Sequence, residues 1–87
     1  MKARQPSEES LRSLRSMLDA FVDGRARTKE HVDNIEALLI REFMGTDIFE
    51  DLTVPVASYA PGGGEYLYDE EALARVFQGV LPRVVVT

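Results

Sequence analysis

Apolar residues recur at spacings of three and four along most of the chain, which is the period of a helix that buries one face. In the first such stretch, Ser7 stands at an N-cap position, and Glu8 and Glu9 follow in the first turn, where the helix dipole favours acids. The pattern predicts a helix over about residues 8–23. It ends at Asp23-Gly24, and its apolar stripe is Leu11, Leu14, Met17, Leu18, Phe21 and Val22.

A second helix is expected after Thr28, which is a suitable N-cap, and Gly45 marks its end. The connection between the two predicted helices is short, so they should pack as antiparallel neighbours. The apolar positions of the second helix are Val32, Ile35, Leu38, Leu39 and Phe43.

The third segment is less regular. It begins at Thr46 or Asp47, and its apolar positions keep helical spacing, but Pro55 removes one backbone hydrogen bond and clashes with the preceding turn. We expect a short helix, kinked or broken near Thr53. The alternative is one helical turn over 47–52 followed by an extended or newly capped piece. The glycines in Pro61-Gly62-Gly63-Gly64 then require a loop.

The fourth helix has clear boundaries. Asp69 is a suitable N-cap, Glu70 and Glu71 occupy the first turn, and Tyr68 is placed to pack on Leu73. Pro82 closes the helix, and the apolar tail over 83–87 should cover an edge of the core or fray. Four amphipathic segments on short loops predict an all-α fold, a compact four-helix antiparallel bundle that forms a single domain over residues 1–87.

Composition narrows the function classes. The 87 residues are 45% hydrophobic, which suffices for one core, and they include no cysteine, so disulfides and thiolate metal sites are excluded. The N-terminal stretch lacks the apolar core of a secretory signal, and no apolar run approaches the roughly 20 residues that span a bilayer. We therefore expect a cytoplasmic protein that does not enter a membrane.

Negative charge is concentrated in the middle of the chain, whose overall net charge is −5. Residues 42–74 contain no Lys, Arg or His, and such a surface disfavours nucleic-acid binding and attracts a basic protein. The acids in this stretch are Glu42, Asp47, Glu50, Asp51, Glu65, Asp69, Glu70 and Glu71.

Motifs for catalysis are lacking. His31 is the only histidine, so a metal site or catalytic triad has no partners for it, and a surface or capping role is expected. The glycine run is not followed by Gly-Lys-Ser or Gly-Lys-Thr, and the acids do not have calcium-loop spacing. We expect no enzymatic activity, no cofactor and no metal.

Acids and tyrosines together form the predicted partner-binding site. In the simpler interpretation, the acids from Asp69 onward only cap a helix and the tyrosines fill the core. In the other, the uncompensated charge serves binding, because a solvated helix face usually mixes signs. The predicted site residues are Asp47, Glu50, Asp51, Tyr59, Glu65, Tyr66, Asp69, Glu70 and Glu71.

The order of these parts resembles the colicin D immunity protein family. The resemblance spans about residues 11–81, and the quoted segments are Phe21-Val22-Asp23-Gly24, Ser58-Tyr59-Ala60-Pro61 and Tyr66-Leu67-Tyr68-Asp69-Glu70-Glu71-Ala72-Leu73. It implies a small acidic helical bundle that binds the tRNA-cleaving domain of a bacterial toxin, with acidic side chains in place of tRNA phosphates. The chain departs from the family at Ala57, Ser58 and Gly62-Gly63-Gly64, where the family carries inhibitory acids.

We therefore expect an immunity or antitoxin protein that inhibits a basic toxin nuclease domain, with tyrosines near the loop as the strongest contacts. The alternative is a small acidic interaction or regulatory domain without a toxin partner. In that case the chain would form a homodimer that buries Val84-Val85-Val86.

Overall fold

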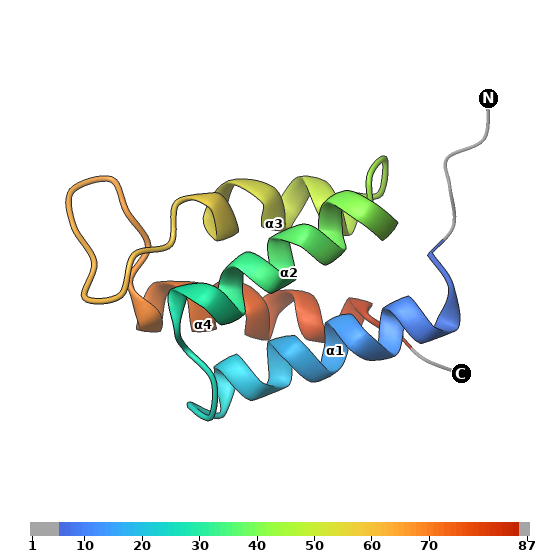
Figure 1. Ribbon diagram of the computed structural model, residues 1–87, viewed down its shortest axis with the longest axis horizontal. Coiled ribbons are helices and arrows are strands. Elements are labelled where there is room, and N and C mark those ends of the chain that lie inside the picture. The colour runs from blue at the N-terminus through green and yellow to red at the C-terminus, as the bar shows by residue number, and fades with distance from the viewer. Residues whose placement is uncertain (1–5, 86–87) are drawn as a thin grey trace.

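Four helices run up and down in a ring (Figure 1), in a computed structural model that describes residues 6–85. Each helix packs against the next one along the chain, and the last packs against the first. The all-α four-helix bundle is confirmed. Its helices are α1 (Glu8–Val22), α2 (Lys29–Glu42), α3 (Asp47–Ala57) and α4 (Glu70–Val80), followed by the 3-10 turn η1 (Leu81–Arg83).

Each of the four α-helices begins at a side-chain cap. Ser7 and Thr28 cap α1 and α2 as predicted, and each hydroxyl oxygen accepts a hydrogen bond from the backbone N–H three residues ahead. Thr46, rather than Asp47, caps α3, because its hydroxyl accepts from the backbone N–H of Phe49 at 3.1 Å. Asp69 caps α4. These local contacts satisfy backbone donors that have no partner inside the helix.

The third segment forms one helix, so the proposed split after Thr53 is wrong. Pro55 lies in the last turn of α3, and the helix continues to Ala57. Pro55 itself is buried, as are Leu52 and Val56 on the same helix. Packing of this buried face holds the backbone helical past the proline, and only one backbone hydrogen bond is lost so close to the helix end.

The core is centred on aromatic rings. Phe21 packs edge-to-face against Tyr59 and Phe77, with centroids 5.4 and 5.1 Å apart, which is a favourable arrangement for aromatic pairs. Val84 is also buried, so the tail covers an edge of the core, while Val85 is exposed. Val86 and Thr87 lie outside the described residues.

Two polar contacts reinforce the antiparallel pairing of α1 with α2. The hydroxyl of Ser10 donates to the carboxylate of Glu42 at 2.9 Å, and Nε2 of His31 lies 3.0 Å from the carbonyl oxygen of Met17. His31 thus has a structural partner in the neighbouring helix. Within residues 6–85, no helix has both the length and the apolar character needed to cross a membrane.

Candidate functional site

The predicted acidic residues do not form one patch, which corrects the interpretation of a single acidic surface. Asp47, Glu50 and Asp51 lie in the first turns of α3, whereas Glu65 lies in the loop before α4 and the sequence Asp69-Glu70-Glu71 opens that helix. Because α3 and α4 are antiparallel, the start of α3 lies beside the end of α4. The two groups are therefore separated by about the length of α4, roughly 16 Å for its residue count at ~1.5 Å per residue.

The acids of α3 are partly neutralised by a base from another part of the chain. Arg83 of η1 forms an ion pair with Asp51. Asp47 and Arg83 also line a surface hollow of about 340 Å³, together with apolar residues such as Ile48 and Val85. This end of the molecule consequently offers less uncompensated charge than the sequence suggested.

The connection from α3 to α4 is a closed loop of residues 60–68, which we call the 60–68 loop. Its ends are joined by an isolated bridge between Tyr59 and Tyr68, in which Tyr68 donates to the carbonyl of Ser58 at 3.0 Å and Ala60 donates to the carbonyl of Tyr68 at 2.9 Å. A surface loop whose ends meet in this way is an Ω-loop. It projects from one end of the bundle (Figure 1).

Two acids at the start of α4 have structural roles: Asp69 caps the helix, and Glu70 bonds to the loop. The carboxylate of Asp69 accepts from the backbone N–H of Ala72 at 2.8 Å, and that of Glu70 accepts from the backbone N–H of Gly62 at 2.9 Å. The hydrogen bond from Gly62, with one from the residue's own backbone N–H, lowers the pKa of Glu70. Both carboxylates have structural partners, so the simpler interpretation describes part of their role.

Gly63 lies against the same helix start. Its φ is +78°, in the left-handed region that favours glycine, and a Cβ there would lie 3.1 Å from Cβ of Asp69. The glycine run is therefore required by the path of the loop, which folds back closely onto the α4 N-cap.

The three tyrosines have different environments. Tyr59 is only 2% exposed, and its hydroxyl donates to the carbonyl of Arg27, so its assignment as a surface contact residue is wrong. Burial raises the pKa of Tyr59, and the carboxylate of Glu70 raises it further. Tyr68 is partly buried against the core. Tyr66 is 91% exposed and is the tyrosine that faces solvent.

Tyr66 occupies an unusual backbone position at the outer end of the 60–68 loop. Leu67 donates a backbone hydrogen bond to the carbonyl of Gly64 at 3.1 Å, which closes a four-residue turn over 64–67. Tyr66 is the third residue of this turn and has a φ of +64°, while Glu65 does not have a positive φ. This is the sign pattern of a type II turn, whose third position normally holds glycine or asparagine.

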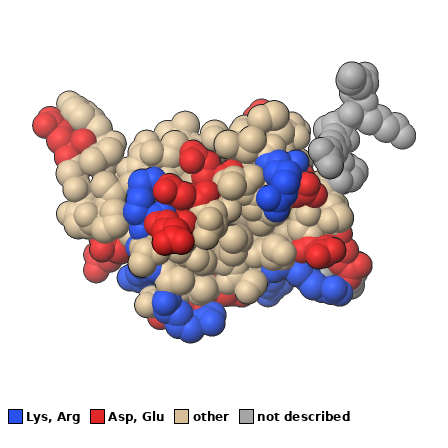
Figure 2. Space-filling model, in the orientation of Figure 1, with Lys and Arg blue, Asp and Glu red and all other residues tan. Residues whose placement is uncertain are grey.

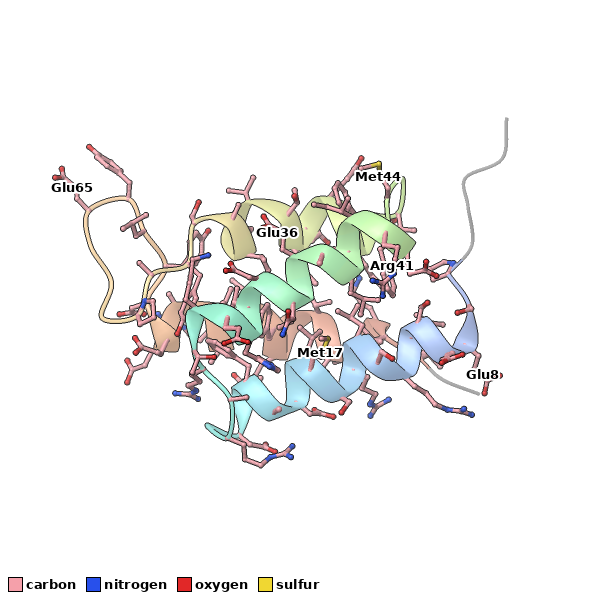
Figure 3. All side chains as sticks on the ribbon, in the orientation of Figure 1. Glu8, Met17, Glu36, Arg41, Met44 and Glu65 are labelled. Atoms are coloured by element: carbon pink, nitrogen blue, oxygen red, sulfur yellow. The ribbon has the colours of Figure 1, made fainter. Side chains whose placement is uncertain are left out.

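Exposed acids lie at the same end of the bundle as this tyrosine. Glu65 lies at the tip of the loop (Figure 3), and Glu71 is also exposed. Figure 2 shows acidic and neutral atoms on the projecting loop and no basic ones, whereas the helical body carries both signs. Of the predicted residues, the structure thus brings together Glu65, Tyr66, Asp69, Glu70 and Glu71 at one end of the bundle.

Arg27 has a structural role that the sequence analysis did not assign. Its guanidinium donates to the carbonyls of Phe21 at 2.7 Å and Val22 at 2.9 Å, which caps the C-terminus of α1, and it lies over the Phe21 ring. The signal available in the sequence was a base just after a helix end, where such side chains bind the last carbonyls. The backbone carbonyl of Arg27 accepts a hydrogen bond from the hydroxyl of Tyr59, so Arg27 lies close to the base of the loop.

The described residues do not assemble a cluster of metal ligands. Between Pro6 and Val85, no group of three or more His, Asp or Glu side chains could hold a metal ion. A hollow of about 390 Å³ along α1 is lined by Arg12, Arg15, Ser16, Asp19 and Arg25, and it contains none of the predicted site residues. The 60–68 loop with the first turn of α4 is the surface that best fits a binding role.

Comparison of the chain with protein families, curated proteins and solved structures finds no match. The resemblance to the colicin D immunity family therefore stays an interpretation of the sequence pattern.

Proposed function

We propose that this protein is an immunity-type inhibitor that binds the basic catalytic domain of a tRNA-cleaving toxin. The observation that carries the proposal is the exposed Tyr66 at the end of a braced loop, with Glu65 and Glu71 exposed in the same region. An exposed aromatic ring in an acidic setting is suited to a partner with a pocket inside a basic surface.

The sign of the charge favours a nuclease as partner. An enzyme that binds a nucleic-acid backbone needs a basic active-site surface, because each phosphate is negative. The acids that repel nucleic acid from this protein would attract that surface, steer its approach and compete with the substrate. An acidic loop placed over such an active site would exclude tRNA without any chemistry of its own.

The test is inhibition of a purified toxin nuclease domain. The first choice is a basic C-terminal domain encoded beside the gene for this protein, and the second is a panel of tRNA-cleaving domains of the colicin D type. We expect loss of tRNA cleavage at equimolar inhibitor and co-elution of the two proteins in gel filtration. A basic nuclease of unrelated fold serves as the control for non-specific charge effects.

Two results would contradict this proposal. One is full tRNA cleavage by every domain tested at excess inhibitor. The other is a gene neighbourhood of metabolic enzymes without a toxin, which would favour a regulatory role.

The second candidate is a small interaction domain that forms a homodimer. It is supported by Ile40 in α2 and Met44 in the turn that follows this helix, two apolar side chains that are 51% and 56% exposed. Val84 is buried in its own core, so a dimer cannot use the whole Val84-Val85-Val86 segment as its interface. Analytical ultracentrifugation of the wild type and Met44→Asp tests this candidate, which requires a dimer that the substitution dissociates.

A further inference from the structure

Tyr66 is held in a backbone conformation that is unfavourable for a residue with a side chain. Its φ of +64° lies in the left-handed region, where a Cβ crowds the following carbonyl oxygen and destabilises the folded chain. Glycine at this turn position would avoid the cost, and Gly62, Gly63 and Gly64 immediately before it show that the segment accepts glycine readily. The presence of a tyrosine at position 66 therefore needs a reason.

No contact within the described residues offsets this strain. The side chain of Tyr66 is 91% exposed, so it gains almost nothing from burial. Between Pro6 and Val85, Tyr66 makes no hydrogen bond and no ring contact with another residue. Strain that the fold itself does not use is typical of residues that contact a ligand or a partner.

The rest of the loop holds the backbone that carries this ring. The backbone bridge at Tyr59 and Tyr68 closes the base of the loop, and the hydrogen bond from Gly62 to Glu70 fixes its first turn to α4. The backbone bond from Leu67 to Gly64 fixes the second turn, in which Tyr66 lies. A turn whose backbone is already fixed loses little backbone freedom on binding, which increases affinity.

The neighbours of Tyr66 indicate the chemistry of the surface that it meets. Leu67 is 47% exposed beside it, so the contact has an apolar centre. Glu65 precedes it at the tip of the loop, and the projecting loop carries acidic and neutral atoms but no basic ones in Figure 2. The complementary surface is an apolar pocket with a rim of Lys or Arg, and a buried tyrosine within a charged rim is typical of a binding hot spot.

We propose that Tyr66 is the anchor of the interface, and that its ring enters an apolar pocket on the basic nuclease domain while Glu65 pairs with a base at the rim. This inference rests on the proposed function, because it takes the nuclease domain as the partner. In this proposal the side chain of Tyr66 determines how tightly the complex is held, and the acids determine how fast it forms.

Three variants and one control test this role. Tyr66→Ala removes the ring, and Tyr66→Gly removes both the ring and the strain. Glu65→Gln removes the charge at the tip. Met44→Ala is the control, because Met44 is an exposed apolar residue that lies far from Glu65 in Figure 3. Binding to the nuclease domain is measured by surface plasmon resonance, and melting curves of the free proteins are recorded in parallel.

We expect Tyr66→Ala and Tyr66→Gly to weaken affinity by at least about 30-fold, mainly through faster dissociation. Tyr66→Gly should also raise the melting temperature of the free protein, since glycine relieves the left-handed strain. A residue with a purely structural role would not show a gain in stability together with a loss of binding. Glu65→Gln should slow association, and Met44→Ala should change neither rate by more than about twofold.

The outcomes separate the two proposals. One outcome is that the wild-type protein binds the nuclease domain and the affinity of Tyr66→Ala is within about threefold of the wild-type affinity. That result would overturn the role of Tyr66 as anchor and leave the proposed function standing. Wild-type protein that binds none of the domains would overturn both. A Tyr66→Gly variant that is less stable than wild type would show that the tyrosine supports the fold, and would likewise overturn the anchor.

Discussion

The hydroxyl of Tyr59 donates a hydrogen bond to the backbone carbonyl of Arg27, at a distance of 2.5 Å. This contact joins the start of the 60–68 loop to the connection between α1 and α2. The same arginine caps α1 with its guanidinium, so one residue links the first helix to the base of the loop. The loop is thus anchored to the body of the bundle as well as to α4.

Loss of the Tyr59 hydroxyl should weaken the fold modestly. Tyr59→Phe keeps the ring against Phe21 but leaves the carbonyl of Arg27 without this donor, so we expect a loss of about 0.5–1.5 kcal/mol in the free energy of unfolding. Urea denaturation at neutral pH measures it. Tyr68→Phe is a control that removes a hydroxyl from the other tyrosine of the bridge. Equal stability of wild type and Tyr59→Phe would show that the hydrogen bond contributes nothing.

Ionisation of Tyr59 should lower the stability of the fold in alkali. The pKa of Tyr59 is raised by burial above its ordinary value of 10.0, so the folded state binds the proton more tightly than the unfolded state. This contribution is complete below pH 10 and is lost as the pH rises through the folded-state pKa. Urea midpoints measured from pH 8 to 11 should fall less steeply for Tyr59→Phe than for wild type. Parallel curves would contradict the assignment.

Protonation of Glu70 should lower the stability of the fold in acid. Its pKa is lowered from the ordinary value of 4.5 by the hydrogen bond from Gly62, so the stabilisation is present above that value and is lost as the pH falls. Glu70→Gln should therefore flatten the dependence of the melting temperature on pH between neutrality and about pH 3. Glu71→Gln is the matched control, because Glu71 lies beside it in the same helical turn. The prediction fails if both variants show the same change.

Substitution of two neighbouring glycines distinguishes the cost of backbone strain from the cost of a steric clash. Gly62→Ala and Gly63→Ala place a side chain at similar positive φ values, +84° and +78°, but only the second brings a Cβ within 3.1 Å of Asp69. Both variants should lose about 1 kcal/mol through strain, and Gly63→Ala should lose more because Asp69 must shift from its cap position. Chemical denaturation compares them. Equal losses would show that the loop relaxes away from α4.

Charge removal at the two ends of the bundle should have unequal effects on binding. Glu65→Gln with Glu71→Gln, and Asp47→Asn with Glu50→Gln, each remove two negative charges. Only the first pair lies at the end that carries Tyr66, so only it should slow association with the nuclease domain, by about three- to tenfold at low salt. Stopped-flow measurements at two salt concentrations provide the test. A larger effect of the α3 pair would place the interface at the other end.

Local chemistry explains what could be read from the sequence. The caps at Ser7, Thr28 and Asp69 act within three residues, so the sequence contains all the information that they need. Pro55 is the contrasting case, because the helix around it is kept by burial of Leu52 and Val56 against other helices. Propensity alone could not show that packing would outweigh one missing hydrogen bond.

The candidate site was only partly predictable for a similar reason. Arg83 neutralises Asp51 across 32 residues of sequence, so a stretch without bases did not mean a surface without bases. Tyr59 and Tyr66 are the same residue type in the same region, yet one is in the core and the other in solvent. Their difference depends on the backbone path of the loop, which the pattern of apolar positions does not specify.

The backbone bridge between Tyr59 and Tyr68 also bears on how such proteins diversify. The chain leaves the bundle at Tyr59 and returns to it at Tyr68, and these two points are adjacent. The residues at the loop tip can therefore change without altering the helices that support the loop. Selection for recognition of a new partner would then act on a few positions around Tyr66, at little risk to folding. The bundle would then stay a constant frame while the residues at the loop tip changed.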